Sequence, residues 1–393
     1  MHAQVVVAGH VCLDVIPTFA DQRGNPGALF QPGKLVNVGT AVTAPGGAVS
    51  NTGLALHRLG VPVKLLGKVG DDIFGQELLN IFRGYDKSLA EGMIVSETEA
   101  TSYTIVISPP GVDRFFLHCS GPNDTFVASD VDISELSGAR IFHFGYPPIM
   151  RRIYLDGGVE FARLLQQVKA AGLATSLDMA IPDANSEAGT LNWKAFLRRV
   201  LPFVDLFLPS VEELLFMLDR PYFDTLTESG NFAGRIDATM LAQLAERVLD
   251  MGVAIVAIKL GDQGLYVRTT ADAARLAAMG AAAPQTISGW LGRELLSPCF
   301  QVDVVGTTGA GDCTIAGFLA GFLKGLSLED VIIGATAVGG FNVESPDATS
   351  GIPDWETVQA RIQAGWEKRT PTLLLDGWQQ KGLWLGPEDN KKH

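Results

Sequence analysis

The chain has 393 residues, of which 47% are hydrophobic and 19% charged, with a formal net charge of -13 and a pI of about 4.9. This length allows one large domain with an elaboration, and the composition excludes a disordered chain. The negative charge, without a local basic patch, argues against a nucleic-acid partner. It does not exclude nucleotides, because backbone amides and metal ions can bind phosphates locally.

The sequence shows neither a targeting segment nor a cysteine framework. The opening MHAQVVVAGH lacks the basic region and long apolar core of a signal peptide, and no apolar run is long enough to cross a bilayer. The four cysteines have no CxxC pair or metal-ligand spacing, and the six histidines have no paired spacing. We therefore expect a cytoplasmic protein without membrane contact, with reduced thiols and without a histidine metal cage.

Short apolar runs alternate with longer amphipathic stretches along the chain. The expected buried strands are VVVAG (5–9), IFHFG (141–145), ATSLD (174–178), VDLFLP (204–209) and AIVAIKL (254–260). Intervening segments such as VEFARLLQQVKAAG and MLAQLAERVLDMG carry apolar residues at helical spacing and end in glycine. This alternation predicts an α/β fold, a sandwich with a central, mostly parallel sheet covered by helices.

Some regions interrupt the alternation. Residues 15–44 are turn-rich, and residues 101–119 contain SYTIVIS and DRFFLHC, which predict paired strands of a small β sheet. Residues 270–299 are expected to be an insertion and 371–393 a C-terminal extension. The rest of the α/β domain is expected to comprise 1–14, 45–100 and 120–370.

The stretch GTTGAGDCTIAGFLAGFL predicts a helix that begins near Gly309 to Asp312. Gly309, Ala310 and Gly311 carry little or no side chain, so an anion could approach the free amides and the positive dipole of the first turn. Asp312 beside such an anion hole is best explained as a general base for a phosphoryl transfer to an alcohol. The alternative is an ordinary aspartate cap on a glycine-rich turn.

The stretch PGGAVSN places Gly46 and Gly47 before a helix, with Asn51 four residues after the second glycine. The glycine pair would let a hydroxylated ligand reach the backbone, and an asparagine offers a donor and an acceptor to a diol. The alternative is a plain helix start with a solvated Asn51. The stretches LGKVGDDIFG and IKLGDQG put glycines and aspartates at strand ends, where ligands gather in open α/β sheets, although simple turns would look the same.

The order and spacing of GGAVSN, VGDDIFG, KLGDQG and TTGAGD resemble the ribokinase-like carbohydrate kinases over about residues 5–353. The resemblance implies ATP-dependent transfer of the γ-phosphoryl group to a sugar hydroxyl, with Mg²⁺ on the nucleotide and a small β lid that excludes water and could support a homodimer. By position it implies these roles: Asp312 as catalytic base, the Gly309 to Asp312 backbone as anion hole, Asp14, Gly46, Gly47 and Asn51 as sugar contacts, and Gly261, Gly264 and Thr308 as nucleotide contacts.

The acceptor stays open between a sugar, a nucleoside and a keto-deoxy sugar acid. Arg114, in the expected lid, could meet an acidic group of such a substrate, although a solvated strand charge explains it equally. A protein of another class, a non-catalytic sugar sensor on the same fold, is the further alternative, which the intact GAGD argues against.

Two departures from the family pattern concern cation binding. Gly306 stands where the family usually has an aspartate that helps to hold a monovalent cation, which weakens the expectation of K⁺ activation. Ser210 stands for the asparagine of an Asn-x-x-Glu segment linked to magnesium, while Glu213 is kept and could act on the metal through water. The same Ser-x-x-Glu pattern is also that of a helix capping box.

Overall fold

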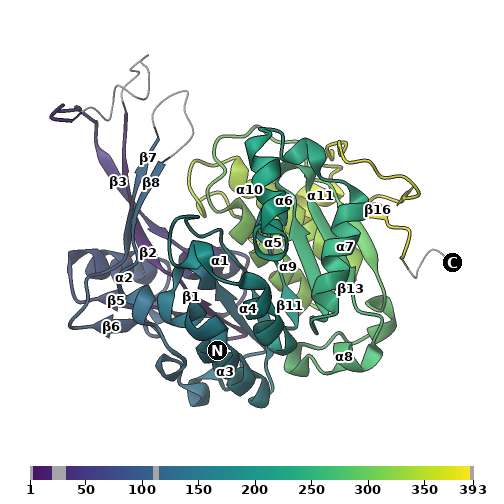
Figure 1. The fold of residues 1–393 in the computed structure, drawn as a ribbon, viewed down its shortest axis with the longest axis horizontal. Coiled ribbons are helices and arrows are strands. Elements are labelled where there is room, and N and C mark those ends of the chain that lie inside the picture. The colour runs from purple at the N-terminus through teal and green to yellow at the C-terminus, as the bar shows by residue number, and fades with distance from the viewer. Residues whose placement is uncertain (1–2, 20–31, 109–114, 390–393) are drawn as a thin grey trace.

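The main sheet carries the architecture. The structure, a computed structural model, describes residues 3–19, 32–108 and 115–389. Ten strands form this sheet in the order β15-β16-β14-β13-β12-β11-β10-β9-β1-β4 (Figure 1). Six of them run parallel: β1 (Val5–Gly9), β4 (Val63–Leu66), β9 (Ile141–Gly145), β10 (Ala174–Leu177), β11 (Leu206–Phe207) and β12 (Ile255–Lys259). The five strands expected from the sequence are all present, and the α/β prediction is confirmed.

The remaining four strands extend the sheet in antiparallel fashion: β13 (Leu265–Thr269), β14 (Glu294–Ser297), β15 (Gln379–Gln380) and β16 (Trp384–Leu385). The expectation that 270–299 is an insertion is therefore wrong for its last part, because β14 is an internal strand of the main sheet. Residues 371–389 likewise lie against the body rather than apart from it. Buried Trp378, Leu383 and Leu385 anchor that segment, because their apolar surface is removed from water.

Helices cover both faces of the sheet because its strands are apolar on both sides. Alternate residues of one strand show this division, since Val5 and Val7 belong to one buried cluster and Val6 and Ala8 to the other. The first cluster is closed by α1 (Ala48–Arg58), α2 (Ile73–Tyr85), α8 (Ala273–Ala277), α9 (Ala310–Leu323), α10 (Leu328–Val343) and α11 (Trp355–Gln363). The second is closed by α3 (Arg151–Ala170), α4 (Trp193–Val200), α5 (Val211–Leu218), α6 (Arg220–Glu228) and α7 (Ala238–Leu249).

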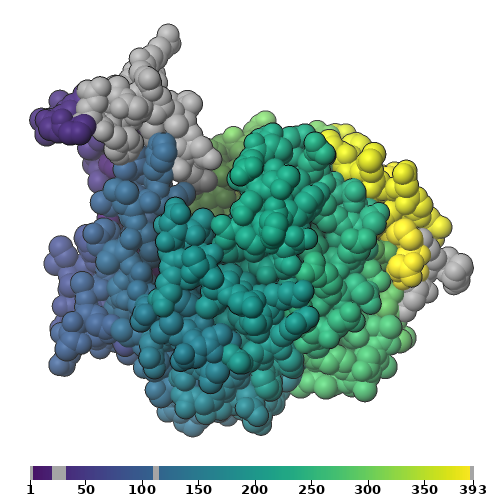
Figure 2. All heavy atoms as spheres, in the orientation of Figure 1, coloured from purple at the N-terminus to yellow at the C-terminus, as the bar shows by residue number. Residues whose placement is uncertain are grey.

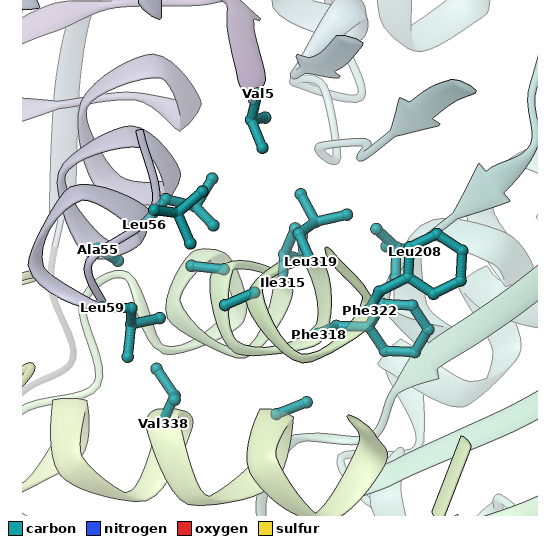
Figure 3. Packing of buried hydrophobic residues seen from close by; sticks show 14 of the residues in the cluster. Val5, Ala55, Leu56, Leu59, Leu208, Ile315, Phe318, Leu319, Phe322 and Val338 are labelled. Atoms are coloured by element: carbon teal, nitrogen blue, oxygen red, sulfur yellow. The ribbon is translucent and has the colours of Figure 1, made fainter. Parts of the chain in front are cut away.

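Helix α9 is apolar nearly all round, which is the composition of a helix buried on every side. It contacts both α1 and α10, and Figure 3 shows Ile315 and Leu319 directed toward Val5 and Leu56. Only the first residues of α9 approach solvent. The packing of the rest of the helix therefore determines where its first turn reaches the surface.

A second sheet of four strands, here called the small sheet, projects from the body beside β1 (Figure 1). It has the order β3-β2-β7-β8, with β2 (Cys12–Pro17), β3 (Ala41–Gly46), β7 (Tyr103–Ile107) and β8 (Phe115–Cys119). Its strands begin at Cys12 and reach Gly46, slightly beyond the expected 15–44. Parts of the expected ranges, 20–31 and 109–114 with Arg114, lie outside the described residues.

Two short strands, β5 (Lys68–Gly70) and β6 (Ile94–Ser96), pair next to the small sheet's base. Figure 2 shows the small sheet rising from one side of the body while the C-terminal segment covers the opposite side. Within 3–19, 32–108 and 115–389, every helix is too short or too polar to cross a bilayer.

Candidate active site

The N-terminus of α9 is open in the way that the sequence predicts. Gly309 precedes the helix with φ of 74°, a left-handed conformation that favours glycine, and no side chain caps the helix there. The Ala310 amide donates to the Thr307 carbonyl at 3.3 Å. Helix geometry leaves the amides of Gly311 and Asp312 without an intrahelical acceptor. The amides left open at this tip are therefore those of Gly311 and Asp312.

Asp312 lies in the first turn of α9 and is 3% exposed. Its carboxylate caps no amide of its own helix. It accepts hydrogen bonds from Asn51 Nδ2 at 3.0 Å, and Thr52 Oγ1 lies 3.4 Å from its other oxygen. Burial raises the pKa of Asp312, while the bonds from Asn51 and Tyr146 act in the opposite direction. A carboxylate that is buried, raised in pKa and placed beside free amides fits a general base better than a helix cap.

The N-terminus of α1 brings Asn51 to this carboxylate. Asn51 is buried, so the alternative of a solvated side chain is wrong. Its backbone amide donates to the Gly47 carbonyl at 2.9 Å. A β-carbon on Gly47, whose φ is 85°, would lie 2.6 Å from His10, and one on Gly46 would lie 2.6 Å from the Asp14 carboxylate. Both glycines therefore serve close packing between the start of α1 and the residues around β2.

Tyr146 is a member of the site that the sequence analysis misses. It follows the last glycine of β9, and its hydroxyl lies 2.8 and 3.0 Å from the two oxygens of Asp312, to which it can donate one proton. Its φ of 66° is left-handed, a conformation that costs a non-glycine residue on the order of 1 kcal/mol or more. A tyrosine directly after a buried strand was the available signal.

Asp14 lies on β2, and its carboxylate lies beside Gly46 of β3, which directly precedes the start of α1. Burial raises the pKa of Asp14 to about 6, and the Cys12 thiol donates to it at 3.4 Å. The His10 and Tyr146 rings lie 6.1 Å apart, which links the Asp14 region to Asp312. Asn123 is buried and holds the Val11 backbone through its side-chain oxygen and nitrogen.

A cavity of about 320 Å³ lies on the other side of the α9 tip. Its lining includes Gly261 and Gly264 from the turn after β12, and Ala310 and Gly311 from α9. Both turn glycines have positive φ, 55° and 110°. Thr307 rather than Thr308 lines this cavity, because the Thr308 carbonyl accepts from Asn342 Nδ2 at 3.1 Å on the inner side of the loop.

Lys259, the last residue of β12, is a second residue that the sequence analysis misses. It lines the same cavity and forms an ion pair with Asp178, which follows β10. A methyl group on Gly311 would lie 3.8 Å from Lys259 Nζ, so the ammonium sits next to the free amides. Burial alone would lower the pKa of Lys259, but the carboxylates of Asp178, Glu213 and Asp312 raise it. A charged residue closing an otherwise apolar strand was the available signal.

Glu213 forms the capping box that its sequence pattern predicts. Its amide donates to Ser210 Oγ at 3.2 Å, and the Ser210 amide donates to Glu213 Oε2 at 2.6 Å. Burial raises the pKa of Glu213, which the Lys259 charge partly offsets. The structure therefore gives this glutamate a capping role, and its carboxylate is also part of the charge cluster around Lys259.

Gly306 has a packing reason to be glycine. A β-carbon there would lie 2.8 Å from the Ser345 carbonyl and 3.1 Å from the Pro346 carbonyl. An aspartate at this position would require those carbonyls to move. The loop therefore lacks the carboxylate that the family pattern places at this position.

Comparisons with known proteins agree with the family resemblance. The model of the pfkB family carbohydrate kinases matches residues 2–355. An uncharacterized sugar kinase of Archaeoglobus fulgidus is 25% identical over 300 residues, covering 76% of this chain and 98% of its own. Fructokinase-2 of Zea mays is 24% identical, covering 91% and 93%, and 2-dehydro-3-deoxygluconokinase of Bacillus subtilis is 26% identical, covering 84% and 90%.

Solved structures show the same fold. The ribokinase of Arabidopsis thaliana, in complex with ribose and ATP, superimposes with a TM-score of 0.67 at 19% identity, covering 92% of this chain and 99% of its own. The prediction of a ribokinase-like sandwich is thereby confirmed.

Proposed function

The chain belongs to the pfkB family of carbohydrate kinases, and we propose that it transfers the γ-phosphoryl group of ATP to a hydroxyl of a sugar or sugar-like alcohol, with Asp312 as the general base. The observation that carries the proposal is a buried carboxylate of raised pKa in the same helical turn as two amides without intrahelical acceptors. In this reaction the acceptor hydroxyl loses its proton to Asp312, its oxygen bonds to phosphorus, and ADP leaves.

The acceptor binds on the side of Asp14, Asn51 and Tyr146 in this proposal. The Tyr146 hydroxyl already bonds the Asp312 carboxylate, in the manner that an acceptor hydroxyl would. A bound sugar then takes over one of these bonds, and Asn51 and Asp14 bond neighbouring hydroxyls. The relatives named above include a fructokinase and a sugar acid kinase, and both acceptor classes are arms of the test below.

The nucleotide binds in the cavity lined by Gly261, Gly264 and Gly311. The Gly311 and Asp312 amides hold oxygens of the transferring group, and Lys259 lies beside them to balance its charge. Glu213 is suited to hold a water of the nucleotide's Mg²⁺, which supplies further positive charge at the phosphates. Without an aspartate at Gly306, any monovalent cation there relies on backbone carbonyls, so we expect weak dependence on K⁺.

The small sheet acts as the lid of this site, because β2 carries Asp14 and lies beside the acceptor pocket. Its outer residues Val42 and Leu117 are 56% and 55% exposed, which suits a homodimer formed through the lid. Sedimentation of the purified chain would give a monomer if this part of the proposal is wrong.

The central test is Asp312→Asn, which keeps the shape of the side chain and removes its basicity. We expect ADP release with acceptor to fall by about 10²- to 10⁴-fold, while the thermal unfolding midpoint stays near that of the unchanged protein. Asp250→Asn, at the end of α7, is the matched control and should retain full turnover. Wild-type turnover in a folded Asp312→Asn variant would refute the mechanism.

A panel of acceptors resolves the substrate class. Hexoses, pentoses, nucleosides and keto-deoxy sugar acids are each supplied with ATP and Mg²⁺, with and without K⁺, and ADP release is measured. Binding of a sugar without turnover of any acceptor would instead indicate a sensor and contradict the proposal.

A further inference from the structure

Three potential metal ligands meet where the small sheet joins the body. His10 follows β1, Cys12 begins β2, and His118 lies on β8, 108 residues after His10. One donor atom from each of the three lies within 4.8 Å of the other two. His10 and Cys12 are buried and His118 is exposed, so the cluster spans the joint from the core to its surface. Neither the phosphoryl transfer nor the fold uses this combination of side chains.

The spacing of the two imidazoles suits a tetrahedral ion. The Nε2 atoms of His10 and His118 are 3.3 Å apart. Two nitrogens at about 2.0–2.1 Å from one zinc ion at a tetrahedral angle lie about 3.3–3.4 Å apart. The Cys12 sulfur lies within 4.8 Å of a donor nitrogen of each histidine and would complete a set of three protein ligands, which leaves a fourth position open.

The surroundings orient these ligands. Thr104 Oγ1 bonds His118 Nδ1 at 3.0 Å, which turns the opposite nitrogen of His118 toward His10. The Cys12 sulfur lies 3.6 Å from the same Thr104 oxygen, so one hydroxyl contacts two of the three ligands. Such a second contact fixes the orientation of a metal-binding histidine. The other nitrogen of His10, Nδ1, is buried without a hydrogen-bond partner among the described residues, so Nε2 carries that ring's only bond there.

We propose that His10, Cys12 and His118 bind a thiophilic divalent transition-metal ion, of which Zn²⁺ is the representative. Binding replaces the thiol proton of Cys12, which is released to the buffer, and uses both imidazoles in the neutral form with the ring proton on Nδ1, so that the proton shared between the two Nε2 atoms moves to Nδ1 and each Nε2 offers a lone pair. The ion links β8 of the small sheet to the beginning of the loop that follows β1. The site therefore couples metal binding to the position of the small sheet.

The position of the cluster predicts an effect on the reaction. Cys12 donates to Asp14 at 3.4 Å, and the His10 ring lies beside Tyr146, which bonds Asp312. An ion on this cluster occupies the space beside the proposed acceptor contacts. It should compete with the acceptor and not with ATP, a consequence that rests on the proposed function, whereas the binding itself does not.

The binding test uses the full chain, freed of metal with a chelator, and Co²⁺ as a spectroscopic probe. We expect one Co²⁺ per chain, visible bands of tetrahedral intensity and a near-ultraviolet thiolate-to-cobalt band, all displaced by one equivalent of Zn²⁺. Cys12→Ser should abolish the thiolate band, and His118→Ala should weaken Zn²⁺ binding by about 100-fold in calorimetry. His57→Ala, which removes a histidine of α1 outside the cluster, and Cys119→Ala, which removes a neighbouring thiol, should leave both readouts unchanged.

Two outcomes would overturn the proposal. One is a Co²⁺ spectrum without a thiolate band in the unchanged protein. The other is Zn²⁺ affinity that survives both His118→Ala and Cys12→Ser in folded protein. Because His118 is exposed, its replacement should leave the thermal unfolding midpoint in place, so lost binding there is not a folding defect.

The kinetic test is separate. Zn²⁺ should raise the KM for the acceptor without changing the KM for Mg-ATP, and His118→Ala should relieve the inhibition. Inhibition competitive with Mg-ATP, or equal in the His118→Ala variant, overturns the acceptor-blocking role. A chain that binds Zn²⁺ as expected but turns over no acceptor refutes the proposed function and leaves the metal site standing.

Discussion

The N-termini of helices α5 and α9 are built in opposite ways. Helix α5 is closed by its own sequence, because Ser210 and Glu213 exchange hydrogen bonds in a capping box. Helix α9 has a left-handed glycine in place of a cap, and its acidic residue turns away to Asn51 and Tyr146. The capping box occupies the Glu213 amide of α5, whereas the first turn of α9 leaves the amides of Gly311 and Asp312 open to an anion.

Lys259 lies between the two helix ends. Its amide donates to the Pro209 carbonyl at 2.8 Å, and it bridges to Ser210 beside the α5 cap. Its ammonium lies next to Gly311 of α9 and pairs with Asp178. The segment that begins α5 therefore positions the backbone of Lys259, while the Lys259 ammonium lies at the N-terminus of α9.

After Asp312→Asn, the largest expected effect comes from Lys259→Met, which removes the charge between the two ends. We expect kcat to fall by about 10²- to 10³-fold, with a smaller change in the KM for the acceptor, because the charge acts on the transferring group. Steady-state ADP release measures both quantities.

The matched control is Lys368→Met. Burial lowers the pKa of Lys368 to about 8, and its ammonium contacts Ser297 Oγ and the Gly382 carbonyl, not a carboxylate of the site. It should keep the unchanged kcat. If both lysine variants lose turnover equally, the loss reflects general damage and not the position of Lys259.

Gly309→Ala tests whether the open end needs its glycine. The added methyl group would lie 2.7 Å from the Ala348 β-carbon at a positive φ, so we expect a loss of about 1–3 kcal/mol in the free energy of unfolding. Displacement of the α9 amides should also lower kcat by about tenfold or more. Denaturant titration and kinetics measure the two effects.

Gly325→Ala is the control at the other end of α9. Its φ is 71°, but a β-carbon there meets no atom within 4 Å. It should share the loss of stability due to the left-handed backbone and keep its kcat. A Gly309→Ala protein with unchanged kcat would show that the open end does not bind the transferring group.

Ser210→Ala opens the closed end. Loss of the bond to the Glu213 amide should lower the free energy of unfolding by about 1 kcal/mol in denaturant titration. Ser327→Ala removes the matching cap of α10 and should cost about the same. A Ser210→Ala protein of unchanged stability would mean that the capping box contributes nothing measurable.

Glu213→Gln gives the smallest effect and a pH signature. Because burial raises the pKa of Glu213 in the folded state, the folded carboxyl binds a proton more readily than the unfolded one. The unchanged protein therefore loses stability as pH rises from the unfolded pKa, about 4.3, to the higher folded pKa. The glutamine variant keeps an oxygen acceptor for the Ser210 amide and lacks this loss, so its relative stability should increase over that window and then level off.

The reference for this comparison is Glu212→Gln, the preceding glutamate in the same turn of α5. It removes one carboxylate from the same turn and so controls for the change in net charge. A Glu213→Gln difference that shrinks with rising pH would contradict the direction of the pKa change.

Local pattern predicted much of the fold and half of the site. Five buried strands could be predicted because continuous apolar runs bounded by turn residues are typical of buried strands. Asp312 could be identified as a candidate base because the residues before it in the first turn of the helix are small. Tyr146 and Lys259 could not be predicted as site residues, because their roles depend on which strand ends lie next to each other in the fold. The strand β14 was not predicted, because an alanine-rich stretch precedes it and its pairing partners lie elsewhere in the chain.

The sequence by itself determined the α/β class, the family and the open helix end, since helix starts, strand runs and glycine turns are governed by interactions among near neighbours. Only the tertiary structure decided that Asn51 and Tyr146 hold Asp312, that Lys259 pairs with Asp178, and that histidines 108 residues apart come within 3.3 Å. These contacts join separate strands and helices, and the burial that alters their charge states exists only once both faces of the sheet are covered.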